Sequence, residues 1–166
     1  MSKAVLLSIA PRWCELIASG KKTVEVRKTR PKIETPFKCY IYMTKDIRFN
    51  TFHVFNAGKV IGEFVCDSVG EAWLQKYHGL HGWLTSWGKE QDCLTGQEMS
   101  EYAGKRDALF GWHISDLVIY DKPKELREFS NGKSVFTIGK NGVLKYTGMT
   151  RPPQSWCYVE EVADDA

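Results

Sequence analysis

The order of apolar and polar residues at the start of the chain predicts a strand followed by a helix. Residues 5–9 (VLLSI) form the short apolar run typical of a buried strand. Pro11 suits the first turn of a helix, because the N–H that proline lacks would have no helical partner there. Three apolar side chains then recur at helical spacing: Trp13, Leu16 and Ile17. With Gly20 as its terminating residue, a helix is predicted over 11–19.

Residues 23–27 (TVEVR) change to a period of two, which predicts a strand. Its two valines face the core in this interpretation, and the other side chains share a polar face that carries both signs of charge: Thr23, Glu25 and Arg27. A capping box, Thr95 with Glu98, predicts a further helix over 96–103. Apolar and β-branched runs predict the remaining strands: 38–44, 58–69, 111–120, 135–138, 143–146 and 156–161.

Two stretches have a less regular pattern. Residues 46–57 are predicted to form a loop that carries three phenylalanines. In residues 70–93, tryptophan and tyrosine are interleaved with glycine, which favours a short helix followed by irregular backbone. Strands outnumber helices in the prediction. No interdomain linker appears, so we expect one domain over 1–161 and a frayed acidic tail over 162–166.

Composition excludes several classes of protein. The chain has 166 residues, of which 43% are hydrophobic and 13% aromatic, too many for a disordered chain. No apolar run approaches the roughly 18 residues that cross a bilayer, and no signal peptide is apparent at the start. The five cysteines contain no CxxC pair, which argues against a disulfide framework and a zinc site. We therefore expect a cytoplasmic protein without a membrane span, a metal or another cofactor.

Charge is distributed unevenly along the chain, although the net charge is only +3. Residues 1–48 hold 11 Lys or Arg against 4 Asp or Glu, whereas residues 49–166 hold 12 against 16. Clustered cations raise the local potential whatever the overall charge, so the first part of the chain favours an anionic partner such as RNA. The alternative is an ordinary solvated surface.

The stretch over residues 6–28 resembles the ASCH domain family, a branch of the PUA-like fold. The resemblance lies in a strand, a helix that ends at a glycine, and the motif GxKxxExR: Gly20, Lys22, Glu25 and Arg27. Weaker similarity comes from 58–64, 112–114 and 155–159, and the segment RPPQSWCYVE is similar to ASCH-like proteins of phages and prophages. The resemblance implies an α+β fold, a small and mostly antiparallel β-barrel with two to four surrounding helices.

The motif also makes chemical sense without the family. Lys22 and Arg27 flank Glu25, and two cations beside a carboxylate can bind a phosphate or hydrogen-bond a base edge. The alternative is an internal network of ion pairs. We predict a cleft beside the motif that binds RNA, a nucleotide or a modified base, with these candidate ligand-binding residues: Arg12, Lys22, Glu25, Arg27, Tyr102 and Trp112.

An enzymatic function is the second hypothesis. ASCH-like amidohydrolases act on an acylated cytidine, and the resemblance implies a lysine and a threonine two positions before the arginine. Here that position is Glu25, and a carboxylate cannot simply replace an activated hydroxyl nucleophile. Lys22 and Glu25 are the candidate catalytic residues of such an amidohydrolase or of a ribonuclease, with one further acid among Asp92, Glu98 and Glu101. Binding is favoured over catalysis.

Other groups are weaker candidates. His78 and His81 lack further ligands at metal spacing. His113 lies in a predicted strand and is interpreted as partly buried, and Cys93 has no identifiable base and is interpreted as inert. A third hypothesis is a phage-encoded module that binds a protein, which would need an exposed apolar patch. The sequence does not predict the oligomeric state.

Overall fold

A computed structural model describes residues 2–45, 55–77, 80–88, 90–133 and 135–163. Most of the predicted loop over 46–57, as well as His78, lies outside these residues. The elements follow in this order: β1 (Lys3–Ile9), α1 (Pro11–Ala18), β2 (Val24–Arg27), β3 (Phe37–Met43), β4 (Lys59–Tyr77), β5 (Leu80–Thr85), α3 (Gly96–Ala103), β6 (Ala108–Glu125), the 3-10 helix η1 (Leu126–Glu128), β7 (Val135–Ile138), β8 (Leu144–Thr147) and β9 (Trp156–Glu160). Among the described helices, none is long and apolar enough to cross a membrane.

Seven strands form one mixed sheet with the order β2-β6-β4-β3-β1-β9, in which β5 pairs with β4, and β7 and β8 form a separate hairpin. β1 runs parallel to β3, whereas β1 and β9, β2 and β6, and β4 and β5 are antiparallel pairs. The predicted α+β class is confirmed. The strand order does not close between β2 and β9, so the predicted barrel is not confirmed.

The chain packs as two compact units. The first unit comprises residues 1–14, 38–64 and 117–166, and the second comprises residues 15–37 and 65–116. β4 and β6 are long enough to contribute to both units. The GxKxxExR motif lies entirely in the second unit. That residues 1–161 form one domain stays a prediction.

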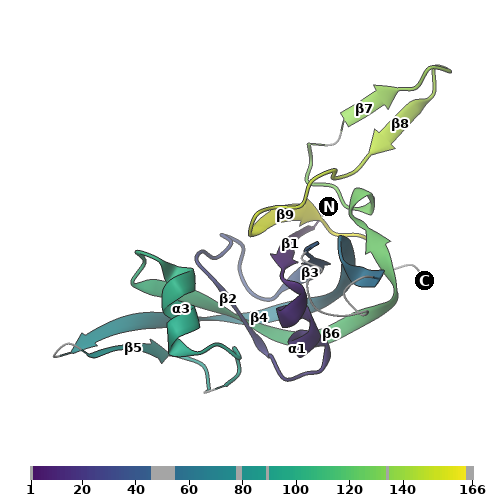
Figure 1. The fold of residues 1–166 in the computed structure, drawn as a ribbon. Helices are drawn as coiled ribbons and strands as arrows, with labels where there is room; N and C mark the ends of the chain where they lie inside the picture. The colour runs from purple at the N-terminus through teal and green to yellow at the C-terminus, as the bar shows by residue number, and fades with distance from the viewer. Residues whose placement is uncertain (1, 46–54, 78–79, 89, 134, 164–166) are drawn as a thin grey trace. The chain divides into compact units, whose positions relative to one another are not determined.

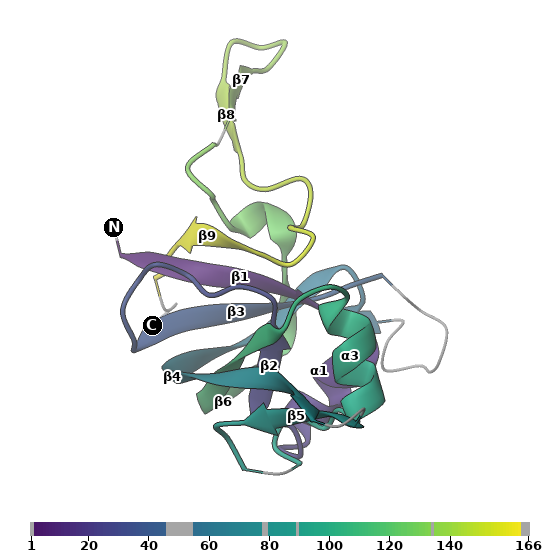
Figure 2. The same ribbon diagram turned by 90° about the vertical axis from the view of Figure 1, so that its left-hand side faces the viewer.

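The first unit is built around β1. β1 lies between β3 and β9, which pair with it on its two sides (Figure 2). Six of its seven residues are buried. Its short apolar run thus forms an interior strand, as predicted. Tyr40 on β3 packs edge-on against Phe129, with ring centroids 4.9 Å apart. The core of this unit gathers the following buried residues: Ala4, Leu6, Tyr40, Tyr42, Val60, Leu126, Phe129, Met149 and Val159.

The second unit combines β2, β5, α3 and the adjoining parts of β4 and β6 (Figure 1). α3 begins at the predicted capping box: the Thr95 side chain accepts from the Glu98 N–H, and the Glu98 carboxylate accepts from the Thr95 N–H. The apolar face of α3 contributes Met99 and Ala103 to the core. Val26 of β2 packs in the same core, as the alternation of β2 predicts.

The short helix predicted in residues 70–93 was wrong, whereas the described residues from 86 to 93 have the irregular backbone that was expected. β4 continues to Tyr77, and β5 returns antiparallel to it over Leu80–Thr85. Aromatic side chains favour strands, and the long β4–β5 ladder pairs backbone groups that irregular structure would leave to water. The strands predicted over 135–138 and 143–146 are confirmed as β7 and β8, which pair antiparallel as a hairpin.

Candidate nucleic-acid interface

The GxKxxExR motif lies at the junction between α1 and β2. Gly20 has φ +75°, a left-handed conformation that glycine adopts without strain and that ends α1. β2 is then fixed on one side by β6, where Glu25 lies opposite Trp112. The backbone N–H groups of Thr23 and Val24 both donate to the carbonyl of Gln91 (2.9 and 3.0 Å), which ties the start of β2 to the segment over 87–94.

The three charged side chains of the motif meet one another. Glu25 Oε1 lies 2.9 Å from Arg27 Nη2, and Glu25 Oε2 lies 3.4 Å from Lys22 Nζ. The exposed fractions of the residues are 2% for Lys22, 5% for Glu25 and 6% for Arg27. All four residues of β2 are buried, so the polar face of this strand is covered rather than open to solvent. We call Lys22, Glu25 and Arg27 the buried ion cluster.

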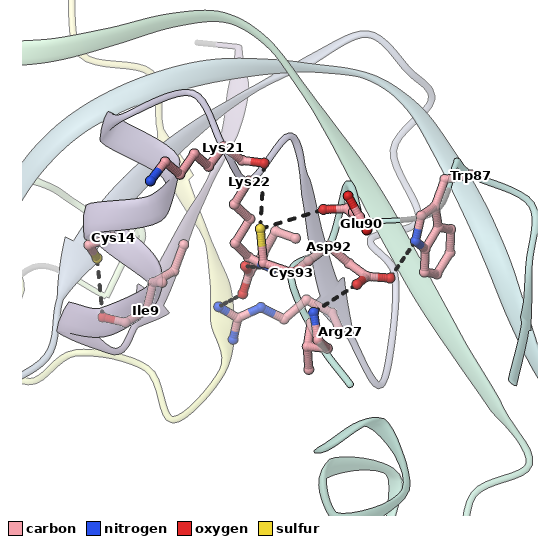
Figure 3. A network of polar contacts seen from close by, with 11 residues as sticks. Ile9, Cys14, Lys21, Lys22, Arg27, Trp87, Glu90, Asp92 and Cys93 are labelled. Carbon is pink, nitrogen blue, oxygen red and sulfur yellow. Dashed lines mark hydrogen bonds and ion pairs between the residues drawn. The ribbon is translucent and has the colours of Figure 1, made fainter. Parts of the chain in front are cut away.

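Asp92 completes the surroundings of the buried ion cluster. Lys22 Nζ donates to the backbone carbonyl of Asp92 at 2.6 Å (Figure 3). The Asp92 carboxylate is itself buried and accepts hydrogen bonds from Trp87 Nε1 at 2.6 Å and from the Leu94 N–H at 2.9 Å. The sequence suggested Asp92 only as one of three acids. Its link to Lys22 spans 70 residues and has no local sequence signal.

This arrangement favours a structural role for the buried ion cluster. Each charge lies beside an opposite charge, and Lys22 also binds a backbone carbonyl. Removing one partner from such a buried group leaves an uncompensated charge, which costs about 3–5 kcal/mol of stability. The contacts connect the end of α1, the strand β2 and the segment over 87–94. The cluster therefore has the geometry of a brace.

Tyr102 lies close to the motif within the second unit. The Lys28 ammonium group lies 5.1 Å from the centroid of its ring, within the range of a cation–π contact. Burial raises the pKa of the Tyr102 hydroxyl, and the nearby Arg27 guanidinium opposes that shift. The hydroxyl is therefore protonated at neutral pH, and the half-buried ring lies beside cations.

Trp112 and Arg12 have different surroundings. Trp112 is fully buried, and its ring meets Phe37 edge-on at a centroid distance of 5.7 Å. In this structure Trp112 therefore has no face exposed for a base to stack on. Arg12 belongs to the first unit, where its exposed guanidinium lies 4.3 Å from the centroid of the Trp13 ring.

Exposed cations follow the motif directly. Lys28, Arg30 and Lys32, which we call the basic segment, are all exposed. Glu34 is the single acidic residue between Lys28 and Phe37. The basic segment is thus the part of the motif region that is open to an anionic partner, whereas Lys22 and Arg27 are not.

The other candidates have ordinary structural partners. Glu98 caps α3, and Glu101 accepts from Gln97 one turn earlier. His113 Nδ1 lies 2.6 Å from Asp67 Oδ1 in a half-exposed pair. The Cys93 thiol donates to the carbonyl of Lys21 at 3.4 Å. Within the part of the chain that the structure describes, no group of three or more His, Cys, Asp or Glu side chains could hold a metal ion.

Comparison with known proteins identifies the family. The family model described as the ASCH domain, a family associated with RNA binding, matches residues 7–124. The structure is similar to crystal structures of ASCH from Zymomonas mobilis (TM-score 0.61, 20% identity, covering 95% of this chain and 88% of that chain) and of a tyrosine-to-phenylalanine mutant of that protein (TM-score 0.61, 20% identity, 96% and 92%). The comparison with curated proteins finds no match. The family match covers well over half of the sequence, and the chain therefore belongs to the ASCH domain family.

Proposed function

We propose that this ASCH domain binds single-stranded RNA through the basic segment, with Tyr102 as a neighbouring ring. The observation that carries the proposal is the exposure of Lys28, Arg30 and Lys32 immediately after a motif whose own cations are buried. Each exposed cation can neutralise a phosphate and release a counterion, which is the main source of affinity for nucleic-acid backbones.

Tyr102 supports RNA rather than a simple anion as the ligand. Aromatic rings beside a basic groove provide stacking surfaces for unpaired bases, each worth roughly 1–3 kcal/mol. The ring of Tyr102 is half-buried, and its contact with the Lys28 ammonium group places it beside the first residue of the basic segment. Phosphate contacts and base stacking would then act side by side in one unit.

The buried ion cluster supports the same proposal indirectly. Arg27 is the last residue of β2, and the basic segment starts at the next residue. A brace that holds β2 against the segment over 87–94 therefore fixes the place where the exposed cations begin. In this proposal Lys22, Glu25 and Arg27 position the interface, and Lys28, Arg30 and Lys32 contact RNA.

Titration of a fluorescent single-stranded RNA oligomer at several salt concentrations tests the proposal. The slope of log affinity against log salt should be about −0.7 for each phosphate contact. The variant with Lys28→Gln, Arg30→Gln and Lys32→Gln should bind more weakly, and the magnitude of its slope should be smaller by about 2 because three contacts are lost.

A matched control removes the same charge elsewhere. The variant with Lys133→Gln, Lys140→Gln and Lys145→Gln neutralises three exposed cations in or beside the β7–β8 hairpin of the first unit. It should retain most of the affinity. No detectable RNA binding by the unmodified protein at low salt, or equal loss in both triple variants, would contradict the proposal.

A further inference from the structure

A half-open pocket of about 530 Å³ lies within the first unit, between the ends of β1 and β3 and the segment that precedes β9. Ten of the residues that the structure describes line this pocket, which we call the polar pocket: Ser8, Tyr42, Thr44, Lys45, Gly58, Leu126, Thr150, Pro152, Pro153 and Gln154. Its volume is in the range that small organic ligands occupy. None of the residues of the GxKxxExR motif contributes to it.

Backbone hydrogen bonds fix the walls of the polar pocket. Ser8 Oγ donates to the carbonyl of Pro153 at 2.6 Å, and the Ser8 N–H donates to the carbonyl of Ser155 at 2.9 Å. At the ends of β1 and β3, the Thr44 N–H donates to the carbonyl of Ile9 and the Gly58 N–H donates to the carbonyl of Met43. The pocket is therefore formed by strand ends whose positions are set within one unit.

Gly58 leaves room for the side chain of Lys45. A Cβ at this position would lie 2.8 Å from Lys45 Cε, and Gly58 has φ +80°. The glycine therefore allows the stem of Lys45 to pass close to the backbone, and the ammonium group can stay at the pocket.

Two polar groups of the pocket have no partner among the described residues. Tyr42 is only 3% exposed, and within the described part of the chain its hydroxyl has no hydrogen-bond partner. The hydroxyl is not among the fully buried side-chain atoms that lack a hydrogen bond, so it keeps some accessible surface at the pocket that Tyr42 lines. Lys45 likewise has no ion pair with any described residue. A ligand in the pocket would supply partners for both groups.

The lining chemistry indicates which ligand fits. The described lining contains one ammonium group, four hydroxyls and one amide, and no carboxylate. The Ser8 hydroxyl already donates to the carbonyl of Pro153, which leaves the hydroxyls of Tyr42, Thr44 and Thr150 as donors for a ligand. Burial raises the pKa of Tyr42, so its hydroxyl can donate a hydrogen bond at neutral pH. This donor set suits an anion that accepts several hydrogen bonds, such as a phosphate monoester. The volume exceeds that of phosphate alone, and Leu126, Pro152 and Pro153 add apolar surface for an organic group.

We propose that the polar pocket binds a small phosphate monoester of the size of a mononucleotide, with Tyr42 and Lys45 contacting the phosphate. The site lies in the first unit and shares no residue with the basic segment, so this proposal does not depend on RNA binding by the second unit.

Calorimetric titration of the full chain with nucleoside monophosphates tests this proposal. The matching nucleoside and inorganic phosphate are probes of the two halves of the ligand. Each should bind at least about tenfold more weakly than the nucleoside monophosphate. Tyr42→Phe removes only one hydroxyl and should weaken binding about 3- to 10-fold, whereas Lys45→Met should weaken it about 10-fold or more. Lys59→Met is the control and should bind as the unmodified protein does, because Lys59 is a half-exposed cation of the same unit outside the lining.

Several results would overturn the proposal. One is the absence of binding by every nucleoside monophosphate, and another is unchanged affinity in both pocket variants. Inorganic phosphate that binds as tightly as the monophosphate would show that no organic group is recognised.

The triple variant of the basic segment should keep its affinity for the monophosphate. Failure of RNA binding and failure of the pocket proposal are therefore distinguishable.

Discussion

The buried ion cluster of the second unit and the polar pocket of the first unit both contain polar side chains with little exposed surface, but they differ in how these groups are satisfied. In the cluster, Glu25 lies 2.9 Å from Arg27 and 3.4 Å from Lys22, and its Oε2 atom has this ion pair with Lys22 but no hydrogen bond. In the pocket, the Tyr42 hydroxyl has no hydrogen-bond partner among the described residues, although the residue is almost fully buried.

This difference indicates different roles. Buried charges that compensate one another keep the surrounding elements in their folded positions. Removing one of these charges leaves the other buried without its partner. Polar groups without protein partners contribute nothing comparable to folding, and they are the groups that a ligand can satisfy. A charged motif is therefore not by itself a binding site. The surroundings of each charge decide whether it is available.

The largest effect is expected for Lys22→Ala. This change should lower the free energy of unfolding by about 3–5 kcal/mol, because it leaves Glu25 with one cation fewer in a buried setting. Lys21→Ala is the matched control, since Lys21 is the adjacent lysine and is exposed. It should change stability by less than about 0.5 kcal/mol. Urea denaturation of the two variants measures both effects. Equal stability of the Lys22→Ala and Lys21→Ala proteins would contradict the structural role of the buried ion cluster.

A smaller effect is expected for the half-exposed pair of Asp67 and His113. The hydrogen bond from His113 lowers the pKa of the Asp67 carboxyl below its usual value. The resulting stability is therefore fully present above the usual aspartate pKa of about 3.9 and is lost as the pH falls through the lower folded-state value. Because both side chains are more than a third exposed, solvent screening limits the contribution to less than about 1 kcal/mol.

Asp67→Asn tests this pH dependence. The variant should lose less stability than the unmodified protein when the pH is lowered from neutral to below about 3.9, since it lacks the titrating carboxyl. Thermal melts across that range measure the difference. The same loss in both proteins would show that the pair adds no stability.

The smallest effect is expected for Tyr42→Phe. It removes a hydroxyl that has no partner among the described residues and keeps the ring in the core of the first unit. Stability should therefore change by less than about 0.5 kcal/mol, or rise slightly. A loss above about 1.5 kcal/mol in urea denaturation would mean that the hydroxyl is satisfied within the protein, and the contrast with Lys22 would fail.

Local signals in the sequence predicted the elements of the fold that depend on nearby residues. The turn at Gly20, the strand β2 and the capping box at Thr95 each involve residues within a few positions of one another, and the structure contains all three. The β4–β5 ladder was missed because strand pairing is decided by distant partners, and aromatic residues interleaved with glycine also suit irregular backbone.

The candidate site shows the same limit. Spacing brought Lys22, Glu25 and Arg27 together correctly, but it could not predict that the segment around Asp92 would cover them. The polar pocket collects residues from position 8 to position 154 and has no motif at all. Burial depends on long-range packing, so the sequence could identify charged residues without showing which of them stay exposed.

RNA affinity of the folded Lys22→Ala protein tests the central claim most directly. We expect the variant to unfold at lower urea concentration, and its folded fraction to bind single-stranded RNA within about twofold of the unmodified protein, because Lys22 has 2% exposed surface and acts as part of a brace. Fluorescence titration at a temperature where the variant is folded supplies the measurement. Normal stability together with a loss of RNA affinity would contradict the account and would make Lys22 a ligand-binding residue.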